Sequence, residues 1–477
     1  MEAHLDARSQ RDHRWPFDEL ELSVLQRVIR SDGQLDHPDI QALRYVLNFA
    51  KLTLLRGEDG TEHDVADLLR THAWWVRDRL EARLVDEEPT LVSALKILPE
   101  LVAATQARRE ELLEKFSLDR ESLEREVCQR KLVLVLGGGG GAGYGYAGIF
   151  DTLARNEIEP SLICGTSIGA LLGLFRARRR RHDARALIEV SKELAWNQVF
   201  TVRSEPSRYG LPATLRLHLR QALEQFVLDE DGMPLRFRTL PIPMHIVVTG
   251  LTMQALKHEL EYYENFLDDT VKPGLVFRVN RVFKIRNLAS VLREMMSEPE
   301  ALKEIVFGLD PLTLDADCLD AAGFSSGIPG LIHYDIHRDD AHMHQLLEGL
   351  YAEHGITRLV EGGVVNNVPA KVGFTSAMRG NVGGHRNVFV LAVDCFAPKR
   401  SSVLFYPVQQ LVRGNVQRNK PYAHHYQTLA RTLSPVNLVP ATDQFLKANT
   451  WANASLSPAL PLLKAVLEPF EPLPPAL

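Results

Sequence analysis

Hydrophobic positions in the first 130 residues recur at helical spacing. One run begins after Pro38-Asp39 and ends at Gly57, with apolar residues three or four positions apart at Ile40, Leu43, Leu47, Ala50 and Leu54. Similar amphipathic runs cover residues 20–29, 65–84 and 91–113. We therefore predict an all-helical N-terminal domain over residues 1–130, with Trp74-Trp75 in its core. Because no catalytic constellation occurs in it, we interpret it as a cap or regulatory domain.

The pattern changes at Lys131, where short apolar runs begin to alternate with helical patterns. Such alternation predicts an α/β domain over residues 131–400, with a central, mostly parallel sheet flanked by helices. The predicted strands are Leu132–Leu136, Leu162–Cys164, His245–Thr249, Arg358–Val360 and Val388–Val393. Residues 401–477 have weaker periodicity and are partly proline-rich, so we assign them to a C-terminal extension.

Composition argues against a nucleic-acid-binding, a disulfide-rich and a secreted protein. The formal net charge of -6 gives no reason to expect a nucleic-acid partner. The four cysteines are far apart and form no CxxC pair, which argues against a disulfide framework or a zinc ribbon. Charges stand at the N-terminus where a secretion signal needs an apolar core. We expect a cytoplasmic protein, with peripheral contact at a membrane left open.

Two glycine-containing motifs suggest nucleophilic chemistry. Ser167 lies within Gly165-Thr166-Ser167-Ile168-Gly169, between a predicted strand and a helical run, as in a nucleophile elbow. The five-glycine run Gly137–Gly141 precedes it by about thirty residues. Backbone N–H groups in such a loop can bind a developing oxyanion, so we select Gly138, Gly139 and Gly140 as an oxyanion hole.

A dinucleotide site is a competing interpretation of the same glycines. Gly138, Gly140 and Gly143 fit GxGxxG, and Glu157 and Glu159 lie near the offset of a ribose-binding acid. That acid should follow the second strand, however, whereas both glutamates precede it. A phosphate loop of the Walker type is excluded because no Gly-Lys-Ser/Thr follows. We therefore expect neither a dinucleotide site nor a Walker-type phosphate site in this loop.

The serine needs a base, and the sequence offers two kinds. His424 or His425 could complete a Ser-His-Asp triad, but neither follows a recognisable strand end. Glu361 follows the apolar Leu359-Val360 and precedes Gly362-Gly363, which places a carboxylate at a strand end. We consider Glu361 the better-placed base.

Taken together, these motifs resemble the patatin-like phospholipases over roughly residues 131–400. The resemblance rests on several elements in order: Leu136-Gly137-Gly138-Gly139-Gly140 leading to Gly143-Tyr144, Gly165–Ala170, Ile246–Thr249, Ser325–Gly330, Glu361–Pro369 and a strand like Val388–Asp394. It implies a lipid acyl ester hydrolase of the phospholipase or lysophospholipase kind. In such an enzyme Ser167 would attack the ester and Glu361 would take its proton, through an acyl-enzyme and without a cofactor.

Two positions depart from that family's pattern. Ala142 stands where the family usually carries Lys or Arg, and Glu361 replaces the aspartate of Asp-Gly-Gly, which adds one methylene to the side chain. These departures leave a second function open: a catalytically weak or inactive patatin-like module that binds lipid or a protein partner.

Two further clusters have alternative interpretations. Arg176, Arg178, Arg179, Arg180, Arg181 and Arg185 form either a solvated helix end or a patch for anionic headgroups. His333, His337, His342 and His344 lie among Asp335, Asp339 and Asp340. We expect this second group to be a polar surface loop rather than a metal site.

Overall fold

The computed structural model describes residues 6–31, 33–57, 59–84, 91–201, 208–211, 213–229, 231–252, 293, 296, 299–336, 340–398 and 406–475. By contact the chain forms two compact units. The first consists of Met1–Leu132, Phe374–Phe389 and Pro458–Leu477, and the second of Val133–Gly373 and Val390–Ser457. The division into three domains with boundaries near residues 130 and 400 stays a prediction.

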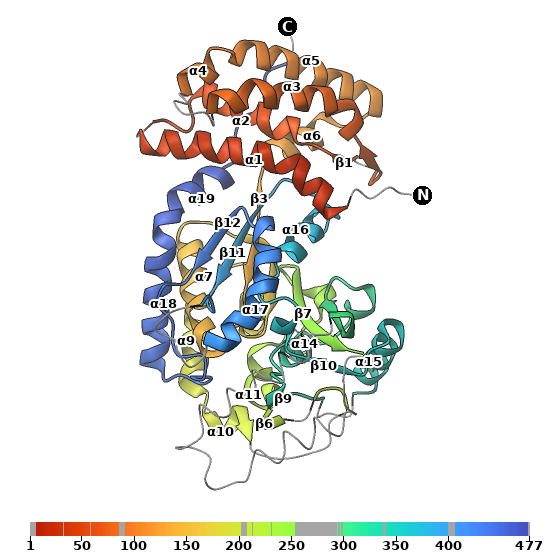
Figure 1. Ribbon diagram of the computed structural model, residues 1–477, viewed down its shortest axis with the longest axis vertical. Coiled ribbons are helices and arrows are strands. Elements are labelled where there is room, and N and C mark those ends of the chain that lie inside the picture. The colour runs from red at the N-terminus through yellow and green to blue at the C-terminus, as the bar shows by residue number, and fades with distance from the viewer. Residues whose placement is uncertain are drawn as a thin grey trace. The chain divides into compact units, whose positions relative to one another are not determined.

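The first unit is built mainly from helices (Figure 1). They are α1 (Ala7–Arg30), α2 (Pro38–Ala50), α3 (Ala66–Leu84), α4 (Leu91–Leu95), α5 (Leu98–Phe116), α6 (Arg120–Cys128) and α19 (Leu460–Leu467). The predicted helix from residue 38 to 57 is too long. It ends at Ala50, and Leu54 instead belongs to a short antiparallel pair, β1 (Leu54–Arg56) and β2 (Glu62–Asp64).

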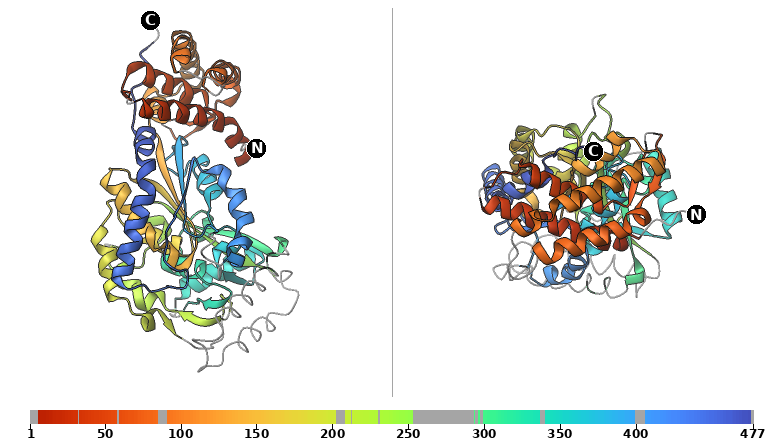
Figure 2. Two further views of the ribbon diagram at one scale, coloured as in Figure 1. Left: turned by 60° about the vertical axis from the view of Figure 1, so that its left-hand side comes forward. Right: turned by 90° about the horizontal axis from the view of Figure 1, so that it is seen from above.

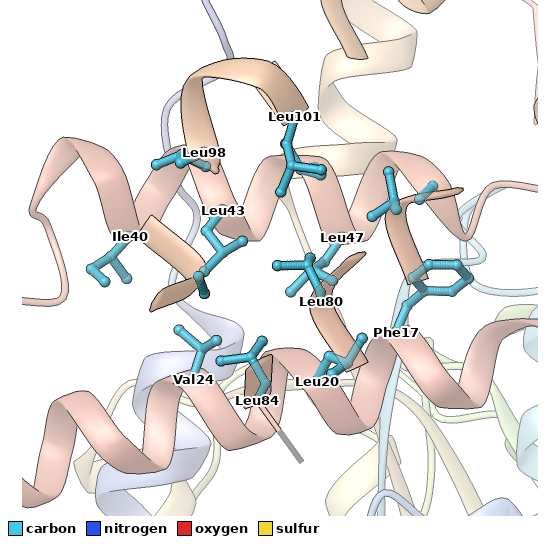
Figure 3. Close-up of a cluster of buried hydrophobic side chains, with 14 of the residues drawn as sticks. Phe17, Leu20, Val24, Ile40, Leu43, Leu47, Leu80, Leu84, Leu98 and Leu101 are labelled. Atoms are coloured by element: carbon cyan, nitrogen blue, oxygen red, sulfur yellow. The ribbon is translucent and has the colours of Figure 1, made fainter. Parts of the chain in front are cut away.

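The apolar faces of these helices meet in a core that Figure 3 shows in close-up. Leu20 and Val24 of α1 converge with Leu43 and Leu47 of α2 and with Leu80 of α3. Burial of each such side chain stabilises the unit by roughly 1.5–3 kcal/mol. The prediction for Trp74 is wrong: its side chain is 66% exposed, because it lies outside the stripe formed by Ala73, Val76 and Leu80. Trp75 is half-buried against this core.

A network of buried charges joins α1 to α2 and to the segment that precedes β3 (Lys131–Leu136). Asp18 accepts a hydrogen bond from Lys51 Nζ (2.7 Å) and another from Arg130. Glu21 accepts from Arg44 Nε (2.9 Å) and lies 3.1 Å from Arg130. All five side chains are buried, and desolvation lowers the pKa of Lys51 to about 7. Each charge therefore depends on its partners for stabilisation.

The second unit contains the greater part of a seven-stranded sheet (Figures 1 and 2). Its strands follow the order β10-β7-β4-β3-β11-β12, and β8 pairs with β7. The sheet is mostly parallel, as predicted. The five predicted strands are confirmed as β3, β4 (Pro160–Thr166), β7 (Met244–Leu251), β10 (Arg358–Val360) and β11 (Val388–Asp394). The sequence pattern did not predict the edge strands β8 (Leu302–Phe307) and β12 (His425–Thr428).

Helices cover both faces of this sheet. In Figures 1 and 2, α18 (Thr442–Leu456) and α17 (Tyr406–Asn419) lie on opposite sides of β11, and α18 packs against α7 (Tyr146–Arg155). The other α-helices of this unit among the described residues are α8 (Ile168–Ala177), α9 (Ala184–Glu193), α10 (Trp196–Val199), α11 (Leu219–Leu223), α14 (Cys318–Ser325) and α15 (Ala341–His354), and α16 (Ala370–Met378) begins in it. A small second sheet pairs β6 (Ala213–Leu217) with β5 (Phe200–Thr201) and β9 (Gly330–His333). Among the described helices, none has both the length and the apolarity needed to cross a bilayer.

The buried charge network generates a stability prediction. Replacing Asp18 with alanine leaves Lys51 and Arg130 buried without their shared carboxylate. We expect Asp18→Ala to lower the free energy of unfolding by about 3–5 kcal/mol, measured by urea denaturation. The matched control is Glu81→Ala, which removes a solvent-exposed pair with Arg77 and should cost less than about 1 kcal/mol. Equal effects of the two substitutions would contradict this account.

Candidate active site

Ser167 lies at a sharp turn between β4 and α8. Its φ of 55° and ψ of -126° are strained for a residue with a side chain, which is typical of a nucleophile elbow. The flanking glycines permit the turn. A Cβ at Gly165 would lie 2.6 Å from the Gly169 carbonyl oxygen, and a Cβ at Gly169 would lie 2.3 Å from that of Leu136. The predicted elbow therefore has the local geometry that its sequence pattern implies.

The register of the sheet brings Glu361 to the same place. Thr166 pairs with Val247 and Val360 pairs with Thr249 along the same edge of β7, since β8 occupies the opposite edge. Because β4 is parallel to β7 and β10 is antiparallel, the two strands end toward each other, and the next residue of each lies beside Val248. These two residues are Ser167 and Glu361, which lie nearly 200 positions apart in the chain.

The Ser167 hydroxyl and the Gly363 N–H both face the Glu361 carboxyl group. The second carboxyl oxygen, Oε2, is buried and has no hydrogen-bond partner among the described residues. Burial raises the pKa of Glu361 to about 8, although hydrogen bonding by these two groups acts to lower it. The extra methylene of glutamate therefore still lets its carboxyl group reach Ser167, and at neutral pH this group is largely protonated.

The glycine loop lies beside this pair. A Cβ at Gly138 would lie 2.7 Å from Asn367 Oδ1 and 3.2 Å from Ser167 Cβ, so any larger residue would force Asn367 to move. The Gly138 N–H donates to the Asn367 carbonyl oxygen (3.0 Å) and is therefore already engaged. For the N–H groups of Gly139 and Gly140, no partner is found within the described part of the chain. Of the three predicted oxyanion donors, these two remain available to a ligand.

Sequence reasoning assigned no role to two side chains that hold the site. Ser325 Oγ, at the end of α14, accepts from the Ser167 N–H (2.8 Å) and donates to the Val247 carbonyl oxygen (2.6 Å). Asn415 Nδ2, on α17, donates to the Gly363 carbonyl oxygen (3.0 Å). A sequence signal for Asn415 exists: it is the first of two buried asparagines spaced i,i+4 on an otherwise apolar helix face, the second being Asn419.

The candidate histidine bases have other partners. His424 Nδ1 accepts from the Val390 N–H (2.9 Å), within β11 and before its carboxyl end. His425 Nε2 pairs with the Gln427 side chain (3.3 Å). Two cavities, of about 110 and 70 Å³, are each lined by Ser167, and neither histidine is among the described residues that line them.

The histidine and aspartate cluster is dispersed among structural contacts. Asp335 accepts from the Arg208 N–H (2.6 Å), Asp340 begins α15 by accepting from the Met343 N–H, and His344 pairs with the Tyr209 hydroxyl. His337 and Asp339 lie outside the described residues. Across the described chain, no group of three or more His, Cys, Asp or Glu is arranged to hold a metal ion.

The arginine cluster separates into two kinds of residue. Arg176 is buried, pairs with Glu159, and donates to the Arg179 carbonyl oxygen (2.9 Å) at the end of α8. Arg178 donates to the Phe226 carbonyl oxygen. Arg179, Arg180 and Arg181 are exposed. The first two therefore stabilise the fold, and three of the five arginines in the predicted Arg176–Arg181 patch face solvent.

Comparison with known proteins agrees with this geometry. The family model described as patatin-like phospholipase matches residues 134–373, which include the glycine loop, Ser167 and Glu361. No curated protein matches the chain significantly. The matched segment covers half of the sequence and holds the elbow described above together with strands β4, β7, β8 and β10. The chain therefore belongs to the patatin-like phospholipase family, which supports lipid acyl hydrolase activity in general.

Proposed function

We propose that this protein hydrolyses acyl esters of lipids through an acyl-enzyme formed on Ser167. The observation that carries the proposal is the position of Ser167 and the buried Glu361, which lie at strand ends that meet beside Val248 and line one cavity. In its ionised form Glu361 takes the hydroxyl proton as Ser167 attacks the ester carbonyl. Glu361 then returns the proton to the departing alcohol, and water releases the fatty acid by the same steps in reverse.

The developing oxyanion needs donors that are fixed before the reaction. Gly139 and Gly140 line the same cavity as Ser167 and Glu361, and their N–H groups have no partner among the described residues. Such a donor contributes roughly 3–4 kcal/mol to transition-state stabilisation. The Ser167 N–H is bonded to Ser325, so its role is to hold the elbow. We assign the oxyanion hole to Gly139 and Gly140, with Gly138 supplying close packing.

One observation supports the alternative, a catalytically weak or inactive module that binds lipid or a protein partner. The raised pKa of Glu361 leaves a small fraction of the base ionised at neutral pH. The effect of the Ser167 hydroxyl on the pKa of Glu361 favours the enzyme over this alternative, because it requires the two side chains to lie close together. Peripheral membrane contact through Arg176–Arg181, the cytoplasmic location and the lack of a cofactor stay predictions.

The nucleophile can be tested with a fluorophosphonate probe and a p-nitrophenyl ester. We expect the wild type to be labelled and to hydrolyse the ester, and Ser167→Ala to lose both activities. Ser457→Ala, which changes an exposed serine, is the matched control and should behave as the wild type. Labelling of Ser167→Ala at the wild-type rate would place the reactive serine elsewhere.

The length of the base can be tested by shortening it. Glu361→Asp draws the carboxyl group back from Ser167 by about 1.5 Å, and misplacement on this scale lowers the rate by about a hundredfold. We therefore expect kcat/KM to fall by that factor, with thermal unfolding measured alongside to confirm that the variant is folded. Higher activity in Glu361→Asp would show that glutamate is a handicap and would favour the inactive module.

The pH dependence follows from the burial of Glu361. The base acts only when ionised, so activity is lost as pH falls through its pKa of about 8. A plot of kcat/KM should rise about tenfold per pH unit below this value and level off above it. An inflection near the ordinary pKa of histidine, about 6.5, would instead indicate a histidine base.

A further inference from the structure

Two separate apolar cavities meet at Ser167. Both are also lined by Gly140, Ile328 and Leu438. The first, which we call the Glu361 cavity, has further lining from Glu361, Val364, Phe396, Leu411 and Val412. The second, which we call the α11 cavity, extends from Leu171 toward Leu194, Phe200, Leu217, Leu219 and Leu223. An ester held at Ser167 can therefore place one half in each cavity.

The position of Glu361 decides which half enters which cavity. As the tetrahedral intermediate collapses, the bond between the carbonyl carbon and the alcohol oxygen breaks, and the alkoxide takes the proton held by Glu361. The alcohol oxygen must therefore lie within hydrogen-bond reach of that carboxyl group. Glu361 lines the first cavity and not the second. The alcohol half thus faces the Glu361 cavity, and the acyl chain faces the α11 cavity.

The lining of the Glu361 cavity sets the chemistry of the alcohol. Val364, Phe396 and Val412 present apolar surface, and among the described residues neither cavity is lined by a lysine or an arginine. A free glycerol or a charged headgroup placed in such a cavity would lose hydration without gaining a partner. An alcohol that itself carries an alkyl or acyl chain gains from burial instead.

We propose that the substrate is a lipid with an apolar chain on each side of the scissile ester, such as a diacyl or triacyl glyceride, with Val412 and Leu411 selecting the alcohol half. Lipids with one chain, whose leaving group is a polar alcohol, fill the α11 cavity alone and are poorer substrates. This inference rests on the proposed function, since it assumes that Glu361 returns the proton to the alcohol.

Two ester series separate the cavities. One varies the alcohol of a hexanoate from ethyl to octyl, and the other varies the acyl chain of an ethyl ester. In the wild type, kcat/KM should rise with both lengths, by a factor of about three to four for each buried methylene. Val412→Trp should abolish the dependence on alcohol length and keep that on acyl length. Leu194→Trp should do the reverse.

A second substitution in each cavity shows whether an effect comes from filling the cavity or from local misfolding of one variant. Leu411→Trp should reproduce Val412→Trp, and Leu223→Trp should reproduce Leu194→Trp. Leu446→Trp adds the same bulk at an exposed position of α18 and should match the wild type. The wild type should also prefer a diacylglycerol to the monoacylglycerol of the same acyl chain. The proposal would be overturned if the Val412 and Leu411 variants lost the dependence on acyl length while the Leu194 and Leu223 variants lost that on alcohol length. It would also be overturned if the wild-type kcat/KM did not change with alcohol length.

Ketone analogues of the same esters, with a methylene in place of the alcohol oxygen, test the cavities without hydrolysis. Their binding is measured by calorimetry on the full chain. If the wild type hydrolyses no ester, the proposed function fails, and ketone binding then decides on the cavities alone. Binding that weakens in both Val412→Trp and Leu194→Trp would sustain a two-chain lipid site. Binding that neither substitution changes would overturn it.

Discussion

The meeting of Ser167 and Glu361 depends on two strands that end toward each other along one edge of β7. Parallel β4 delivers Ser167 and antiparallel β10 delivers Glu361, and both residues lie beside Val248. Side chains from other elements hold these ends in place. Ser325 fixes the Ser167 backbone, the Thr249 hydroxyl donates to the Glu361 carbonyl oxygen (2.7 Å), and Asn415 holds the turn that follows. A shift of one residue in either register would separate the pair.

Burial makes the Glu361 carboxylate a stronger base, and it also lowers the stability of the folded protein. The folded state keeps a proton on Glu361 up to about pH 8, whereas an unfolded glutamate releases it near 4.5. Between these values the folded state binds more protons than the unfolded state, so this group lowers stability as pH rises. The same desolvation makes the ionised carboxylate a stronger base toward Ser167. The site therefore gives up stability for reactivity, which is common at functional sites.

Features set by local sequence could be predicted, and features set by distant contacts could not. Leu132–Leu136 and Val388–Val393 are apolar runs bounded by other patterns, so their strands were predictable, and the elbow around Ser167 has its own signature. Leu54 continues the helical spacing of the preceding residues, so the sequence pattern predicted a helix where the first strand of a hairpin begins. The engagement of the Gly138 N–H by Asn367, and the support from Ser325 and Asn415, arise from residues more than forty positions away along the chain. The exposure of Trp74 depends on which face of α3 its neighbours bury.

The most direct test of the pair is a titration of the Glu361 carboxyl group by difference infrared spectroscopy, with Glu361→Gln identifying its band. This account predicts that the band of the protonated group disappears as pH rises through about 8. Because the hydrogen bond from Ser167 stabilises the carboxylate, Ser167→Ala should move this titration to higher pH. A titration that Ser167→Ala leaves unchanged would mean that the two side chains do not interact, and it would contradict the account.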